Sequence, residues 1–130
     1  MRKRISALII ENKKILLSRD KDLKFYSLPG GALDIGESIQ QALSREIKEE
    51  LNVPIIKSHY YSSYTSFNER LNIRQIDYNY LISINGTPSP SNEIAEIYWF
   101  NKEEFQLHPQ MFFSPFLKEV LPKLLEDSLL

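Results

Sequence analysis

The chain has 130 residues, of which 42% are hydrophobic and 25% charged, so its size and composition are those of one ordinary globular domain, expected to span residues 1–130. A formal net charge of −1 provides no overall field for a nucleic-acid polymer or a membrane surface, and no apolar stretch is long enough to span a membrane. The absence of cysteine excludes disulfides, thiolate metal sites and a cysteine nucleophile, and it fits a cytoplasmic location.

The first residues predict two strands and a glycine turn. Residues 5–10 and 15–18 are mostly apolar and predict strands, and a polar turn around Asn12-Lys13 joins them. A charged loop over residues 19–24 then leads to Pro29-Gly30-Gly31. Two consecutive glycines after a proline indicate a backbone that adopts positive φ or passes close to another group.

A helix is predicted from Ile39 to Leu51. Ser38 is a favourable N-cap and Gln41 completes a capping box, while apolar residues recur along one stripe at helical spacing. Asn52 tolerates the left-handed conformation in which helices often end, and a proline two residues later prevents continuation.

The polar face of this helix concentrates negative charge. Glu46 lies three residues before Glu49 and four before Glu50, and each like-charged pair at such spacing destabilises a helix by roughly 0.2–0.5 kcal/mol. Two of these acids also occupy the last turn, where the helix dipole disfavours anions. Clustered carboxylates suit a hard cation such as Mg²⁺. On the helix alone, the alternative of a solvated acidic face, partly offset by Arg45 and Lys48, stays open.

Two long strands are predicted after the helix, over residues 55–67 and 73–84, with a turn near Asn68-Glu69. Aromatic side chains on these strands are either core residues or platforms on which a nucleobase can stack. One alternating face of the second strand contains Ile76, Tyr78, Tyr80 and Ile82.

The last part of the chain predicts one further strand and two helices. Residues 85–91 form a loop by composition and lead into a strand that ends at Phe100. Asn101 caps a short helix through Phe105, and residues 109–113 form a loop whose apolar side chains line either a pocket or a partner interface. Pro115 begins a final helix, which Pro122 should kink or break. This order of elements is typical of a mixed α/β or α+β fold with a sheet covered by helices.

The segment from residue 28 to residue 53 resembles the sequence box of MutT-like Nudix hydrolases. That box consists of Gly, five residues, Glu, seven residues, and then Arg-Glu-U-x-Glu-Glu-x-Gly-U, where U is bulky and aliphatic. The chain matches it at Gly31, Glu37, Arg45, Glu46, Ile47, Glu49, Glu50 and Val53. Asn52 replaces the last glycine, which is a conservative change because both residues can occupy a left-handed helix end.

The resemblance implies an α/β/α sandwich and a hydrolase that cleaves a diphosphate linked to another group. The implied cofactor is Mg²⁺, with Mn²⁺ as a substitute. The implied partner is a small nucleoside diphosphate derivative such as a nucleoside triphosphate, a nucleotide sugar or ADP-ribose. Homodimers are frequent in the family, and the sequence leaves the oligomeric state and the individual substrate open.

The resemblance also assigns roles to individual residues. The implied metal ligands are the Gly30 carbonyl, Glu37, Glu46, Glu49 and Glu50. Arg45 would orient a carboxylate, with Glu37 as its first candidate partner. The general base is either Glu46 or a later acid, for which Glu93 is the first candidate and Glu96 the second. The alternative that both later acids are solvated residues at the edge of a strand stays open. Arg19 and Tyr26 are implied substrate contacts, although an ordinary surface arginine fits position 19 as well.

Three other readings remain from the sequence. A Nudix-like domain can bind a nucleotide as a sensor without cleaving it, but the presence of all four box acids argues against this. An isopentenyl diphosphate isomerase shares the fold, and the lack of cysteine argues against that enzyme. A purely structural protein would give no calorimetric signal with Mg²⁺ or Mn²⁺.

Overall fold

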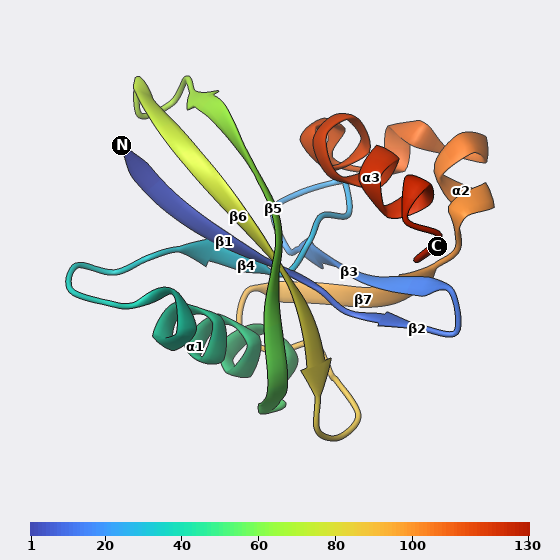
Figure 1. The fold of residues 1–130 in the computed structure, drawn as a ribbon, viewed down its shortest axis with the longest axis horizontal. Helices are drawn as coiled ribbons and strands as arrows, with labels where there is room; N and C mark the ends of the chain where they lie inside the picture. Colours follow the sequence, from blue (N-terminus) through green and yellow to red (C-terminus); the bar gives the residue numbers. More distant parts are fainter.

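The computed structural model describes all 130 residues and contains two β-sheets with helices on both sides (Figure 1). The four-stranded sheet has the order β4-β1-β6-β5, formed by Gly30–Ala32, Arg2–Leu8, Ile73–Ile84 and Ile55–Asn68. The three-stranded sheet has the order β2-β3-β7, formed by Ile10–Glu11, Lys14–Asp20 and Ile94–Phe100. The three α-helices are α1 (Ile39–Leu51), α2 (Lys102–Leu107) and α3 (Leu121–Glu126).

The first predicted strand is divided between the two sheets, which corrects the expectation of one strand over residues 5–10. Strand β1 ends at Leu8 and pairs in parallel with β6, whereas only β2 pairs with β3 across the Asn12-Lys13 turn. Ile9 lies between the two strands and is fully buried. The parallel partner of β1 is some 70 positions away in the sequence, so the local apolar pattern cannot reveal this division.

Two hydrophobic clusters form the core, one on each side of the sheets. The first contains Ala42, Leu43, Ile47 and Leu51 of α1. They pack against residues of β1, β3 and β6. The second is rich in phenylalanine and joins the sheets to the C-terminal helices; its rings include Phe100, Phe105, Phe112 and Phe116. Helices therefore cover both sides, which confirms the predicted α/β/α sandwich.

Helix α1 begins and ends at the predicted residues. The Ser38 hydroxyl accepts a hydrogen bond from the Gln41 backbone N–H, and the Gln41 side chain accepts one from the Ser38 N–H. Asn52 adopts the left-handed conformation, with φ 57° and ψ 37°. None of the helices combines the length and the hydropathy needed to cross a membrane.

The C-terminal segment differs in detail from the prediction. Asn101 caps α2 through a capping box with Glu104, and the helix extends two residues beyond Phe105, to Leu107. The final helical segment starts as a π-helix over Phe116–Val120 and becomes α-helical at Leu121. The expected break thus lies immediately before Pro122, which cannot donate a backbone hydrogen bond to the preceding turn.

Candidate active site

The predicted glycine turn is wrong in one respect, because Gly30 and Gly31 belong to strand β4 and pair with β1, where they lie in close contact with both β1 and α1. Gly30 has φ +150°, and a Cβ atom there would lie 2.0 Å from the Ile5 carbonyl oxygen. A Cβ atom on Gly31 would lie 2.6 Å from Glu46 Oε1. The Gly30 N–H donates a hydrogen bond of 3.1 Å to the Glu50 carboxylate. Glycine is therefore required at Gly30 by the Ile5 backbone, and Gly31 lets the backbone of β4 pass directly beside the Glu46 carboxylate of α1.

Arg45 connects the acids of the site. Its guanidinium donates to both carboxylate oxygens of Glu37, at 2.7 and 2.9 Å, and to Glu46 Oε1 at 2.7 Å. A further hydrogen bond of 3.1 Å reaches the Ala32 carbonyl. This bidentate contact, followed by the Asp34 backbone N–H, lowers the pKa of Glu37 to about 2. Arg45 therefore fixes the positions of two box carboxylates and keeps Glu37 ionised.

Two of the acids are buried side by side. Glu46 is 9% exposed and Glu50 is 4% exposed, although neither is a residue type that proteins usually bury. Burial, and after it the neighbouring Glu46 carboxyl, raises the pKa of Glu50 well above the ordinary value of a glutamate. Asp20 adds a smaller effect in the same direction. A bound cation would offset this repulsion and desolvation.

Glu49 lies apart from this pair. Its side chain is 46% exposed, and one carboxylate oxygen is 3.6 Å from Arg45. No three His, Asp or Glu side chains converge closely enough in the structure to hold a metal ion. Because its side chain is exposed, the position of Glu49 is not fixed by packing. The oxygen-only donor set fits Mg²⁺ or Mn²⁺.

The last turn of α1 is held by the segment before β7. The Ser91 hydroxyl and the Asn92 amide donate to the Glu49 carbonyl, at 2.6 and 2.8 Å. Backbone N–H groups of Ser91 and Ser89 donate to the carbonyls of Glu50 and of the following leucine. These carbonyls lack partners within the helix, so the loop supplies the missing hydrogen bonds at the turn that carries the acids.

Three of the predicted functional residues form a separate group. Glu96 accepts a hydrogen bond of 2.5 Å from Arg19 and one of 2.8 Å from the Tyr26 hydroxyl. Neither Arg19 nor Tyr26 lines the cavity described below; the adjacent Phe25 does. Glu93 is exposed in the turn before β7 and, after burial, is the next cause that raises the pKa of Asp20. Glu93 therefore lies near Asp20, which in turn lies near Glu50. Glu96 is instead hydrogen-bonded to Arg19 and Tyr26.

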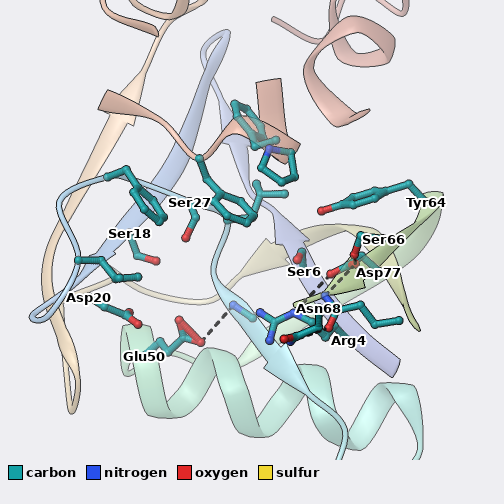
Figure 2. A pocket seen from close by; sticks show the side chains of 18 residues that line it. Arg4, Ser6, Ser18, Asp20, Ser27, Glu50, Tyr64, Ser66, Asn68 and Asp77 are labelled. Carbon is teal, nitrogen blue, oxygen red and sulfur yellow. Dashed lines mark hydrogen bonds and ion pairs between the residues drawn. The ribbon is translucent and has the colours of Figure 1, made fainter. Parts of the chain in front are cut away.

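A cavity of about 300 Å³ opens beside the acids. Figure 2 shows Glu50 and Asp20 on one side of it and Arg4, Ser66 and Asp77 on the other. Three of these charged residues, Arg4, Asp20 and Asp77, were not identified from the sequence. Asp77 was missed because it lies on the face of β6 opposite to Tyr78 and Tyr80, and a polar residue at such a position usually faces solvent. In the structure Asp77 is buried.

The aromatic residues of β5 and β6 divide between the core and the cavity. Tyr78 and Tyr80 pack against the hydrophobic cluster that contains α1, so these two residues belong to the core and are not platforms for a nucleobase. Tyr64 lines the cavity. From the loop before the final helix, Phe113 also lines the cavity and stacks on Phe25 with ring centroids 5.4 Å apart. For residues 109–113 the sequence left a pocket or a partner interface open. In the structure Phe113 lines the pocket, and Phe112 is buried in the core.

Similar proteins are found by sequence and by structure. An ADP-ribose pyrophosphatase of Methanocaldococcus jannaschii is 40% identical over 58 residues, which cover 42% of this chain and 34% of that relative. The chain therefore matches about a third of the length of this curated relative. A solved structure of MutT, from work on Aliivibrio salmonicida and Vibrio cholerae, has a TM-score of 0.76 at 18% identity and covers 97% of this chain and 98% of that chain.

A third similar protein is a bifunctional NMN adenylyltransferase/ADP ribose pyrophosphatase of Francisella tularensis, solved in complex with AMP and a manganese ion. It has a TM-score of 0.73 at 22% identity, over 97% of this chain and 41% of that chain. At such identities the two structures establish the fold alone. The NUDIX domain family matches residues 1–124, which is nearly the whole sequence. The chain therefore belongs to the NUDIX domain family.

Proposed function

We propose that this protein is a divalent-metal-dependent hydrolase that cleaves the diphosphate linkage of a nucleoside diphosphate derivative. The observation that carries the proposal is the buried Glu46–Glu50 pair beside Arg45 at one end of a cavity. Such a pair is unfavourable in a protein that has only to fold, since burial and mutual repulsion both disfavour two carboxylates. It becomes favourable when a cation binds between the acids and a phosphorylated ligand.

The proposed ligands for Mg²⁺ or Mn²⁺ are Glu46, Glu49 and Glu50, with Glu37 and the Gly30 carbonyl as additional donors. When bound, the cation neutralises diphosphate charge and lowers the pKa of a water molecule. Arg45 holds Glu37 and Glu46 in position through the hydrogen bonds described above. The similar structure that contains AMP and a manganese ion supports this choice of ligand and metal.

The reaction is a hydrolysis in which water attacks phosphorus. The water oxygen forms a bond to phosphorus while a bridging P–O bond breaks, and a carboxylate takes the proton that the water loses. We propose Glu93 or Glu46 as this base. Glu96 fits the role less well, because Arg19 and Tyr26 already occupy its two oxygens. Substrate binding by Arg19 and Tyr26 stays a prediction, as do the single domain over residues 1–130 and a homodimer.

The test is product release from a panel of nucleoside triphosphates, nucleotide sugars, ADP-ribose and dinucleoside polyphosphates, with Mg²⁺, Mn²⁺ or chelator. Replacing Glu49 by Gln should preserve the fold, because the side chain is exposed, and should lower metal-dependent turnover at least about 100-fold. Glu69→Gln, in the exposed β5–β6 turn, is the matched control. Full activity in Glu49→Gln would show that Glu49 does not act in the reaction.

The second candidate is a nucleotide sensor that binds without hydrolysis. The arrangement of the acids favours it, since no three of them converge in the structure to hold a metal ion. Nucleotide binding without product at any concentration of Mg²⁺ or Mn²⁺ would support the sensor.

A further inference from the structure

The outer edge of β5 is a long row of backbone groups without partners. This strand is the last of the four-stranded sheet and, with 14 residues, the longest of the chain (Figure 1). Only β6 pairs with it, and none of the backbone hydrogen bonds formed by turns, loops and caps involves residues 55–68. In an antiparallel edge strand, about half of the residues point their N–H and C=O groups away from the neighbouring strand. Such an edge is a template on which a further strand can pair.

Only the first half of this edge is protected against pairing. Edge strands are usually blunted by charged side chains, by proline or by β-bulges. Lys57 is the only lysine, arginine or acidic residue of β5, and the register with β6 shifts between Ile55 and Lys57 and again between Tyr60 and Ser62. Residues 62–68, in contrast, contain no charged residue, no proline and no bulge. The second half of the edge is therefore free to pair.

The other outermost strands do not offer a comparable edge. In the four-stranded sheet, the opposite edge is β4, which has only three residues. In the three-stranded sheet, β2 has two residues, and β7 carries the exposed Glu96. The unprotected half of β5 is thus the longest uncharged free edge of the chain.

The two faces of residues 62–68 have different surroundings. One face lines the active-site cavity with Tyr64, Ser66 and Asn68. The alternate residues, Ser63, Thr65 and Phe67, are exposed on the opposite face. Phe67 is 56% exposed and belongs to neither hydrophobic cluster. A strand paired with this edge covers Phe67 and also satisfies the free backbone groups.

We propose that two copies of this chain pair through residues 62–68 of β5, antiparallel and around a two-fold axis at Thr65, to form a homodimer with one continuous sheet. Thr65 is the midpoint of the unprotected stretch, so this axis pairs all of it and stops at the bulge before Ser62. Thr65 then stands opposite the partner's Thr65, and Phe67 stands opposite the partner's Ser63. Cross-strand pairs of threonine, and aromatic side chains diagonal to a β-branched residue, stabilise antiparallel strands.

A second copy suits this edge because the stretch is compatible with itself. It contains no charge that a two-fold axis would set against its equal, and most of its side chains are hydroxyls or amides that can hydrogen-bond across the pair. In Figure 1 this end of the β5–β6 hairpin projects away from α1. The turn at residues 69–72 lies beyond the paired stretch. The inference is independent of the proposed hydrolase activity.

The first experiment measures molecular mass by analytical ultracentrifugation at low and high micromolar concentration. The wild type should reach twice the 15.2 kDa of one chain as the concentration rises. Thr65→Lys and Thr65→Glu should each stay monomeric, because the axis sets two like charges directly opposite each other. A mixture of the two variants should form the dimer again, since each lysine then faces a glutamate.

Thr87→Lys and Thr87→Glu are the matched controls, because Thr87 is also exposed but lies in a loop outside β5. Both should dimerise like the wild type, and circular dichroism shows whether all four variants are folded. A wild type that is monomeric at every concentration would overturn the proposal and leave the edge to a strand of another protein. Dimers of Thr65→Lys alone, or a mixture that stays monomeric, would refute the axis at Thr65.

The second experiment examines the same edge in the wild type and requires no substitution. Backbone amide hydrogen exchange in residues 62–68 should be slower at high than at low protein concentration, because pairing protects the outward N–H groups. Exchange in β7, which is also an outermost strand, should not depend on concentration. Concentration-independent exchange in residues 62–68 would overturn the proposal, even if the protein forms a dimer through another surface.

Discussion

Replacing Gly31 by Ala should disable the site while preserving the fold. The added Cβ atom would lie 2.6 Å from Glu46 Oε1, whereas ordinary contact begins near 3.4 Å, so the carboxylate has to move by about 0.8 Å. That movement breaks the 2.7 Å hydrogen bond from Arg45. Misplacement by about 1 Å can lower catalytic rates about 100-fold, and overpacking typically destabilises by about 1–3 kcal/mol.

Gly36→Ala is the matched control for this prediction. Gly36 has φ +78°, so alanine is strained there by about 1–2 kcal/mol, but its Cβ atom would meet nothing within 4 Å. Urea unfolding measures the stability of both variants, and steady-state kinetics with Mg²⁺ measure kcat. We expect comparable losses of stability but a large loss of kcat only in Gly31→Ala. If Gly31→Ala kept more than half of the wild-type kcat, the position of Glu46 would not matter as argued.

Two further predictions concern the same helix. The pKa of Glu50 is higher in the folded protein than in the unfolded chain, where it is about 4.3. The stability that Glu50 contributes is therefore fully present below the unfolded-state pKa and is lost as the pH rises through the folded-state pKa. In chelator, urea unfolding at about pH 5 and pH 8 should therefore show the wild type losing at least about 1.4 kcal/mol more than Glu50→Gln, and equal losses would contradict this. Asn52→Gly should change the free energy of unfolding by less than about 1 kcal/mol. Asn52→Ala should lower it by about 1–2 kcal/mol, because alanine is strained at φ 57°. Identical midpoints of urea unfolding for the two variants would refute the role of the left-handed conformation.

The local features of the chain could be predicted from its sequence. Ser38, Gln41 and Asn52 define the two ends of α1 through hydrogen bonds and backbone preferences that involve only near neighbours. The two glycines indicated a close approach, and the structure identifies the Ile5 carbonyl and Glu46 as the groups approached. Spacing alone placed the box acids on one face of the helix, because helical geometry is regular.

The pairing of distant segments could not be predicted in this way. The parallel pairing of β1 with β6 sets Arg4 beside Asp77, and no local pattern encodes that register. The group of Arg19, Tyr26 and Glu96 likewise depends on β3, β7 and the segment that precedes β4 meeting in space. Burial of Asp77 escaped prediction because a polar residue alternating with apolar ones indicates a solvated face, whereas here that face borders a cavity.

The loop over residues 85–92 contrasts with the β5–β6 turn as a place for engineering. By composition both are surface loops, and either would pass as a site for an inserted tag or domain. Ser89, Ser91 and Asn92, however, supply hydrogen bonds to the last carbonyls of α1, including that of Glu49. An insertion there would release the helical turn that presents the acids. The β5–β6 turn at residues 69–72 makes no hydrogen bonds to α1, so it is the better point at which to insert residues.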